Sequence, residues 1–308
     1  MRAAETHPSR VATDAAAGKF VLLREWYCCG MSVPLNVLLC WESIETNSWN
    51  PVLADLLRDA GLAVTEAHDL STLGSLDLSD FDVCLPRFRV GAAHMACLDE
   101  ALVASGIPML NSRESRRRCE NKALAHLAFE EHGIAQPPSF VWSADGARDR
   151  HLDWQGETLL KPLYGNRSGG IEICGSLSEA LERAGERQED LLIQKMIWPA
   201  RCWRIVVGRT SGVVDPYWRR PPGESDRVLS ISTGSQIVRD GYSERLGEVA
   251  TAMLEAVGGD LLAVDILETE SEVYALEINH NFDAHGGDAP AAEAFLLEIQ
   301  RKAPSAVA

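Results

Sequence analysis

The spacing of apolar residues divides the chain into two regions with different patterns. Between residues 35 and 111, short apolar runs alternate with stretches in which apolar residues recur at helical spacing. Asn50 and Pro51 favour a helix start, as N-cap and first helical residue, and Gly61 favours its end. Strands that alternate with helices are typical of a parallel α/β unit. We predict strands at residues 36–41, 62–67, 81–88 and 107–110, and helices at residues 51–60 and 93–105.

The second region consists of short strand-like runs with few helices between them. It follows a helical stretch at residues 113–133, which ends at Gly133. This order favours an α+β architecture with antiparallel strands. The predicted strands lie at residues 158–163, 169–174, 190–197, 202–208, 212–218, 261–267 and 273–279, and the helices at residues 177–187, 242–257 and 291–301.

Four segments are expected along the chain. Residues 1–34 are rich in Ala, Arg and Ser without a sustained period, which favours a disordered leader or a true start at Met31. An α/β N-terminal domain is expected at residues 35–111. A central subdomain is expected at residues 112–193 and a C-terminal subdomain at residues 194–308.

Composition and charge exclude several classes of protein. A chain of 308 residues with 46% hydrophobic and 24% charged residues is ordinary for a soluble globular protein. No apolar run approaches the roughly 20 residues of a membrane span, so we expect a cytoplasmic protein without a membrane partner. The net charge of −16 argues against a nucleic-acid partner, because phosphate contacts require a basic surface. The eight cysteines form no Cys/His cluster at zinc spacing.

Two predicted strands near the C-terminus carry acidic residues within apolar runs. LLAVDILE and EVYALEIN are joined by a polar turn, and a symmetric hairpin places Asp265 opposite Leu276 or Glu277. Because side chains alternate along a strand, Glu277 and Asn279 share a face. Oxygen ligands at this density suit Mg²⁺, which also binds phosphate oxygens. The alternative is that Asp265 and Glu277 are solvent-side residues of an amphipathic hairpin.

A lysine and a glycine-rich loop occur together in the stretch LLKPLYGNRSGG. In a Walker P-loop the lysine follows the glycines and precedes a helix, whereas Lys161 precedes them and the flanking runs look like strands. The Lys161 ammonium group could reach one phosphate, and backbone N–H groups between Gly165 and Gly170 could bind the others. The alternative is a surface lysine. The combination with the acidic hairpin favours a nucleotide site.

With these motifs in this order, residues 36–300 resemble the ATP-grasp superfamily, and within it the RimK-like carboxylate–amine ligases. ENKALAHLAFEEHGIAQPPSF is similar to the segment with the family's first nucleotide-binding lysine, and LLKPLYGNRSGG to the segment with the second lysine and a glycine-rich lid. LLIQKMI is similar to the hinge strand, whose backbone at Lys195 and Ile197 would pair with adenine. VDIL and LEIN match the metal strands.

The resemblance implies α+β ATP-grasp domains after the α/β N-terminal domain, and a set of site residues. Arg204 matches one family arginine, and Arg220, with Arg219 as the alternative, matches the arginine that ends the next strand; guanidinium groups suit a phosphoryl group in transfer. Cys202 stands where the family has an aspartate. The implied nucleotide-binding residues are Lys122, Lys161, Gly165, Ser168, Gly169, Gly170, Gln194, Lys195, Met196 and Ile197, and the implied metal ligands are Asp265, Glu277 and Asn279.

The activity implied by the resemblance is ATP-dependent ligation of a carboxylate to an amine. An acyl phosphate forms first, and the amine then displaces phosphate, so that ADP and phosphate are released. ATP and Mg²⁺, with Mn²⁺ as an alternative, are the implied cofactors. Two other readings are an ATP-binding regulatory protein without ligase activity and a small-molecule kinase of the same fold.

The substrates are not identified by any motif. Small-molecule and peptide carboxylates and amines, and a carrier protein, all remain open. Trp218, Arg219, His280 and Asp283 are candidates for binding the charged ends of an amino acid, with packing and surface roles as the alternative. A homodimer is the starting hypothesis for the assembly.

Overall fold

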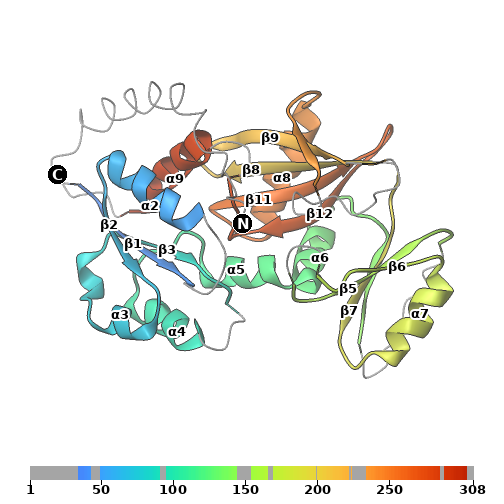
Figure 1. The fold of residues 1–308 in the computed structure, drawn as a ribbon, viewed down its shortest axis with the longest axis horizontal. Coiled ribbons are helices and arrows are strands. Elements are labelled where there is room, and N and C mark those ends of the chain that lie inside the picture. The colour runs from blue at the N-terminus through green and yellow to red at the C-terminus, as the bar shows by residue number, and fades with distance from the viewer. Residues whose placement is uncertain are drawn as a thin grey trace, which may run out of the picture.

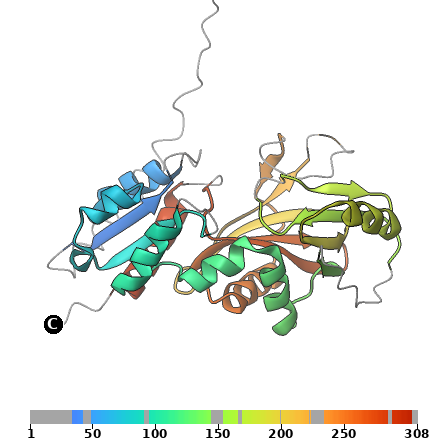
Figure 2. The same cartoon turned by 90° about the horizontal axis from the view of Figure 1, so that it is seen from below.

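The described part of the molecule contains three β-sheets. In this computed structural model they comprise three, four and five strands. The three-stranded and four-stranded sheets lie on either side of the five-stranded sheet (Figures 1 and 2). The leader expected at residues 1–34 lies outside the described residues, apart from Pro34. The structure describes residues 34–42, 49–90, 95–143, 154–165, 169–198, 200–221, 223, 234–284 and 288–303.

The N-terminal unit is a parallel sheet with helices on its faces. In β1, Leu38 and Leu39 are both fully buried, in core clusters on opposite faces of the sheet. Burial of both faces explains why this strand is a continuous apolar run. The strands, in the order β2-β1-β3, are β2 (Ala63–Ala67), β1 (Asn36–Trp41) and β3 (Val83–Arg87), and the helices are α2 (Trp49–Asp59), α3 (Leu70–Gly74), the 3-10 helix η1 (Leu78–Asp80) and α4 (Ala96–Ser105).

The strand predicted at residues 107–110 was wrong. These residues make only an isolated parallel bridge, between Met109 and Cys84. The chain leaves the sheet at Asn111, because the side chain of Asn111 bonds to backbone groups at the start of a distant strand. The N-terminal sheet therefore has three strands.

The start predicted for the first helix was also wrong. α2 begins at Trp49, so Asn50 lies within the helix and is not its N-cap. The Asn50 side chain instead accepts a hydrogen bond from Nε of Arg87, at the end of β3. A tertiary contact has replaced the local capping bond.

The helical stretch predicted at residues 113–133 consists of two helices. α5 (Arg113–Glu120) and α6 (Lys122–Glu131) meet at Asn121, whose backbone is extended and whose side chain accepts hydrogen bonds from N–H groups in the first turn of α6. α5 contains a single apolar residue, Cys119, so apolar periodicity does not reveal the break. The break makes Lys122 the first residue of α6, where its backbone and side chain turn toward the glycine-rich segment.

The central sheet is antiparallel and contains one strand that was not predicted, β4. The strand β7 extends to Lys195, two residues past the expected boundary at residue 193. In the order β4-β7-β5-β6, the strands are β4 (Ser139–Trp142), β7 (Leu191–Lys195), β5 (Thr158–Pro162) and β6 (Glu172–Cys174), and the helix α7 (Leu177–Glu186) packs on them.

The five-stranded sheet is antiparallel and is covered differently on its two faces. The helix α8 packs on one face, whereas residues such as Val206 and Ala263 on the other face join a core with α2 and α9. In the order β10-β9-β8-β11-β12, the strands are β10 (Gln236–Val238), β9 (Gly212–Arg220), β8 (Arg201–Gly208), β11 (Leu261–Glu268) and β12 (Val273–Asn279), and the helices are α8 (Glu244–Ala256) and α9 (Asp288–Lys302).

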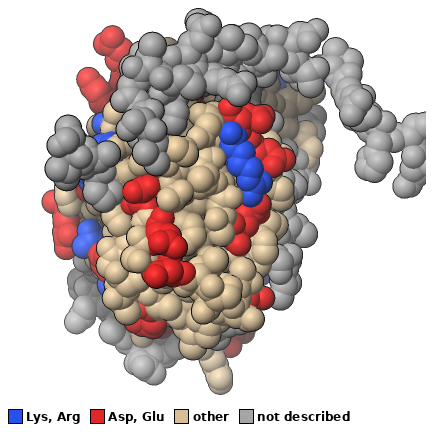
Figure 3. All heavy atoms as spheres, turned by 90° about the vertical axis from the view of Figure 1, so that its left-hand side faces the viewer, with Lys and Arg blue, Asp and Glu red and all other residues tan. Residues whose placement is uncertain are grey.

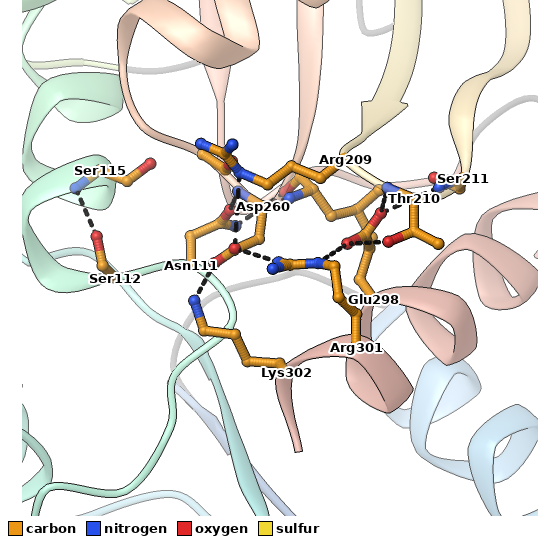
Figure 4. Close-up of polar contacts among 12 residues, drawn as sticks. Asn111, Ser112, Ser115, Arg209, Thr210, Ser211, Asp260, Glu298, Arg301 and Lys302 are labelled. Atoms are coloured by element: carbon orange, nitrogen blue, oxygen red, sulfur yellow. Dashed lines mark hydrogen bonds and ion pairs between the residues drawn. The ribbon is translucent and has the colours of Figure 1, made fainter. Parts of the chain in front are cut away.

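A buried polar cluster ties α9 to this sheet and to the N-terminal unit (Figure 4). Glu298 is fully buried and accepts hydrogen bonds from both backbone N–H groups of the β8–β9 turn and, at 2.8 Å, from Nε of Arg301. Asp260 accepts hydrogen bonds from Arg301 and, at 2.8 Å, from Nζ of Lys302. We call Asn111, Asp260, Glu298, Arg301 and Lys302 the clasp cluster.

The surface reflects the acidic composition. On the side formed by the N-terminal unit, Asp and Glu side chains outnumber Lys and Arg (Figure 3), in line with the net charge of −16. Within the described ranges, no helix combines the length and the apolar content that crossing a membrane requires.

Candidate nucleotide and metal site

A pocket lies between the four-stranded and five-stranded sheets. The space inside it, open solvent included, is about 820 Å³. Most of the residues predicted to bind the nucleotide and metal meet here. One wall includes Lys161, Gln194, Lys195, Met196 and Ile197, and the other includes Arg219, Asp265 and Glu277.

Lys161 lines the pocket from β5 and is buried. Its Nζ donates a hydrogen bond of 2.6 Å to Oε1 of Gln194, whose Nε2 donates one of 2.9 Å to Oγ of Ser139. Desolvation lowers the pKa of Lys161 to about 8; Glu277 opposes this change and Lys122 adds to it. A buried ammonium group whose hydrogen-bond partner is a neutral amide is well suited to an anionic ligand.

Lys122 and the glycine-rich segment are in contact. Nζ of Lys122 donates a hydrogen bond of 3.0 Å to the carbonyl oxygen of Gly165. Gly165 and Gly170 have φ angles of 154° and 74°, a region that favours glycine. A Cβ atom at Gly170 would lie 2.9 Å from a proline ring in β5, so this position has no room for a side chain. Ser168 lies outside the described residues, and the roles of Ser168 and Gly169 stay predictions.

The backbone that follows β7 forms one edge of the pocket. The N–H groups of Lys195 and Met196 donate to the carbonyl oxygens of Pro138 and Glu157 at 2.8 and 2.9 Å. Within the described residues, the N–H group of Ile197 has no backbone acceptor. The Ile197 N–H group is therefore available to a ligand, and the pairing of this segment with adenine stays a prediction.

Asp265, Glu277 and Asn279 share one face of the β11–β12 hairpin. The register pairs Asp265 with Glu277, and Asn279 with Ala263. A β-bulge leaves Leu276 unpaired, so Leu276 and Glu277 both line the pocket, although consecutive residues of a regular strand point to opposite faces. The bulge thus adds an apolar surface beside the carboxylates.

Two arginines hold the Asp265 carboxylate. Arg204 donates from Nε to Oδ1 at 2.8 Å and from Nη2 to Oδ2 at 2.6 Å, and Nη2 of Arg219 donates to Oδ1 at 2.9 Å. Desolvation favours the neutral acid, but the two guanidinium groups hold the pKa of Asp265 below its usual value. Nη1 of Arg219 also lies 3.7 Å from Sγ of Cys202, so the thiol occupies the place beside the arginines where the family has a carboxylate.

Arg219, and not Arg220, is the arginine of β9 that reaches the site. Arg220 is exposed, and its guanidinium group lies 5.1 Å from the ring centre of Trp218. Alternation along β9 allows only one of two consecutive arginines to face Asp265. Of the two arginines predicted for this position, Arg219 is therefore the one that lies beside Asp265.

The oxygen atoms of the hairpin fit a hard divalent cation. Glu277 makes no hydrogen bond or ion pair with the described residues. Asp265 uses three of its roughly four lone-pair positions for the arginines, which leaves one on Oδ2. Asn279 adds an amide oxygen on the same face. In the part of the chain that the structure describes, no three His, Cys, Asp or Glu side chains are placed to hold a metal, so an amide or a ligand oxygen must complete this site.

Two residues near the site were not predicted. Ser139 supports Gln194 from β4, a strand whose short sequence did not stand out. Tyr217 lies opposite Arg204 in the register of β8 and β9 and is buried. Its position two residues before Arg219 was the available signal, because alternate residues of a strand share a face.

Three predicted substrate-binding residues do not line the pocket. His280 is buried, and its Nε2 lies 2.8 Å from Oε1 of Glu120. Burial lowers the pKa of His280, although Glu120 opposes this change. Trp218 donates from Nε1 to an aspartate at 2.9 Å, and Asp283 also has a partner. Of the four candidates, only Arg219 lines the pocket.

Several proteins with assigned names are similar to this chain in sequence. It is 26% identical over 242 residues to a probable alpha-L-glutamate ligase of Parasynechococcus marenigrum, over 73% of this chain and 50% of that protein. It is 23% identical to the alpha-aminoadipate–LysW ligase LysX of Saccharolobus solfataricus, over 56% and 65%. It is 26% identical to the tetrahydromethanopterin:alpha-L-glutamate ligase of Methanocaldococcus jannaschii, over 56% and 62%. The chain thus spans between half and two thirds of these relatives. No protein-family model matches it.

Solved structures share the fold across most of the chain. A D-alanyl-alanine synthetase A from Vibrio cholerae superimposes with a TM-score of 0.65 at 14% identity, over 89% of this chain and 99% of that one. A D-alanine–D-alanine ligase from Bacillus anthracis complexed with ATP gives 0.62 at 13% identity, over 87% and 97%. The fold class expected from the sequence is confirmed. The chain has the fold of the ATP-grasp ligases, and its relatives in sequence are RimK-like carboxylate–amine ligases.

Proposed function

We propose that the protein is an ATP-dependent carboxylate–amine ligase, which forms an amide or peptide bond through an acyl phosphate and releases ADP and phosphate. The main support is that one pocket brings a buried lysine on one wall together with Arg219 and the carboxylates of Asp265 and Glu277 on the other. Arg204 does not line the pocket but pairs with Asp265 beside it. The names of the relatives agree with this activity.

The nucleotide would be held by groups from three elements. The Lys161 ammonium group lacks a counter-charge within hydrogen-bonding distance, so a phosphate would complete it. Lys122 and the backbone of the glycine-rich segment, with Gly165, Gly169 and Gly170, would hold the outer phosphates. The adenine edge would pair with the backbone after β7.

Mg²⁺, or Mn²⁺, would be held by Asp265, Glu277 and Asn279. Glu277 is the ligand that the protein itself leaves without a partner, and Asp265 keeps one free oxygen position. The chemistry that the ion supplies when bound is neutralisation of charge on the phosphate oxygens.

Arg204 and Arg219 would stabilise the negative charge that develops during transfer. Asp265 fixes the orientation of both guanidinium groups before any substrate binds. Preorganised donors of this kind lower the barrier because they need no rearrangement during the reaction. The protein's contribution is positioning and charge stabilisation.

The substrates proposed are a small-molecule or peptide carboxylate and an amine. The relatives are named for glutamate, for alpha-aminoadipate with LysW, and for tetrahydromethanopterin with glutamate. No described residue distinguishes among these compounds.

ADP release measured with paired carboxylate and amine pools tests the proposal. We expect release to require a carboxylate and to yield an amide product in the presence of an amine, with hydroxylamine trapping the acyl phosphate as a hydroxamate. A stable phosphorylated product without an amine requirement would identify a kinase instead. Binding of ATP without ADP release from any pool would identify a regulatory protein.

A further inference from the structure

A row of polar side chains crosses the five-stranded sheet. The strand registers place Glu277 opposite Asp265, Asp265 opposite Arg204, and Arg204 opposite Tyr217. Residues directly opposite each other in a sheet point to the same face. These four residues therefore form one row, which we call the polar row. Tyr217, at its end, is the member that no motif had indicated.

The polar row lies at a boundary on this face of the sheet. Two residues along in one direction, Cys202 and Leu267 line the nucleotide pocket. Two residues along in the other direction, Val206 and Ala263 belong to the core with α2 and α9. The row thus separates the nucleotide pocket from the N-terminal unit. A carboxylate that attacks a phosphate in the pocket must lie over this boundary.

The hydroxyl group of Tyr217 has no hydrogen-bond partner among the described residues. Tyr217 is 2% exposed, and its Oη atom is buried. The side chain lies between two cationic residues, because Arg204 is its neighbour across the strands and the guanidinium group of Arg239 lies 5.9 Å from its ring centre. Buried hydroxyl groups are normally paired, and leaving one unpaired destabilises the fold. A ligand that accepts a hydrogen bond from this hydroxyl group would remove that penalty.

We propose that Tyr217 binds the acyl substrate by donating a hydrogen bond from its hydroxyl group to a carboxyl oxygen held beside Arg204. The inference rests on the ligase function proposed above. Glu277 and Asp265 occupy the phosphate end of the polar row, and neighbouring strands are about 4.8 Å apart, which puts Tyr217 about 10 Å from the Asp265 strand. That separation suits a carboxyl group next to the transferred phosphate. Arg239 is paired with Asp215, but Arg204 and Arg219 together carry two positive charges against the one carboxylate of Asp265, which favours an anion over the ammonium group of an amine.

Kinetics of Tyr217→Phe test the assignment. ADP release and hydroxamate formation would be measured with ATP, Mg²⁺, hydroxylamine and a panel of L-amino acids and short peptides as carboxylates. We expect the KM for the carboxylate to rise on the order of 10–100-fold in the variant, because a hydrogen bond to a charged group is lost. The KM for ATP should stay within about twofold, since Tyr217 does not line the nucleotide pocket.

Tyr242→Phe is the matched control. Tyr242 is 41% exposed and packs against Trp203, whose side chain lies in the core on the opposite face of the sheet. Removal of the Tyr242 hydroxyl group should leave the KM for the carboxylate and the KM for ATP unchanged. Circular dichroism melts of both variants would verify that they fold.

The outcomes separate this inference from the proposed function. An unchanged carboxylate KM in Tyr217→Phe, or equal changes in the KM for ATP and the KM for the carboxylate, would overturn the assignment and leave the ligase intact. A wild-type protein that releases no ADP with any carboxylate would overturn the ligase function, and this inference with it.

Discussion

The clasp cluster and the pocket are two buried polar clusters on one sheet that differ in how their groups are paired. In the clasp cluster, Glu298 and Asp260 each accept hydrogen bonds from several donors (Figure 4). In the pocket, Glu277 makes no hydrogen bond or ion pair with the described residues, Lys161 bonds to a neutral amide, and the Tyr217 hydroxyl group is unpaired.

This difference separates a structural role from a binding role. An unpaired polar group in a buried position costs more free energy than a paired one, because hydrogen bonds and ion pairs offset part of the desolvation penalty. The clasp cluster is complete without a ligand and holds α9 against the turn between β8 and β9. The pocket contains polar groups that would gain hydrogen bonds or a counter-charge only when a ligand binds. Four variants or conditions test this contrast.

Glu298→Ala should have the largest effect, a loss of about 3–5 kcal/mol of unfolding free energy. The change removes the acceptor for the β8–β9 turn and one partner of Arg301. Urea denaturation would measure it, with exposed Glu293→Ala on the same helix as the control. Affinity of the folded variant for an ATP analogue should stay within about twofold. A stable Glu298→Ala protein would show that the clasp is dispensable.

Glu277→Gln should lower ADP formation by about 100–1,000-fold, equivalent to about 2.7–4 kcal/mol of barrier, judging from other electrostatic sites. The unfolding free energy should not fall, because Glu277 pairs with no described residue. Exposed Glu272→Gln in the hairpin turn is the control. Equal ADP formation in the two variants would remove Glu277 from the proposed metal site.

Nucleotide affinity should fall as pH rises through the pKa of Lys161, about 8. The ammonium form binds phosphate, and the neutral amine dominates above that pKa. At pH 9 only about one lysine in ten would be charged, so affinity for an ATP analogue should be about tenfold weaker than at pH 7. Isothermal calorimetry would measure this, and Lys161→Arg should bind without the decline because arginine stays charged. A flat wild-type profile from pH 7 to pH 9 would argue against a charged contact.

Arg220→Ala should have the smallest effect, less than about twofold in kcat/KM, since Arg220 is exposed and stacks only on Trp218. The neighbouring variant Arg219→Ala should lose tenfold or more, because it leaves Asp265 with one arginine. Steady-state ADP release would compare the two. A larger loss of kcat/KM in Arg220→Ala than in Arg219→Ala would mean that β9 presents its other face to the substrate.

Much of the fold was predictable, because short-range patterns reflect local geometry. A symmetric hairpin about the polar turn predicted that Asp265 lies opposite Leu276 or Glu277, and the register pairs it with Glu277. The break at Asn121 was not predicted, because α5 has too few apolar residues to show a period, and two hydrogen bonds from the next turn to the Asn121 side chain decide the structure there. Consecutive arginines also differ in burial in a way that residue type does not predict. Arg116 is fully buried and pairs with Asp99, whereas Arg117 is exposed.

The sequence by itself determined the order of helices and strands, the acidic hairpin and the lysine before a glycine-rich loop, because these features depend on neighbours a few residues apart. Only the tertiary structure decided which groups remain without a partner. Lys161 and Glu277 line the same pocket from two different sheets. Arg219, and not Arg220, bonds to Asp265, and Tyr217 lies at the end of the polar row. These facts follow from strand register and the packing of sheets, which join residues far apart in the chain, such as Arg219 and Asp265 with a separation of 46 positions, and leave no local periodicity in the chain.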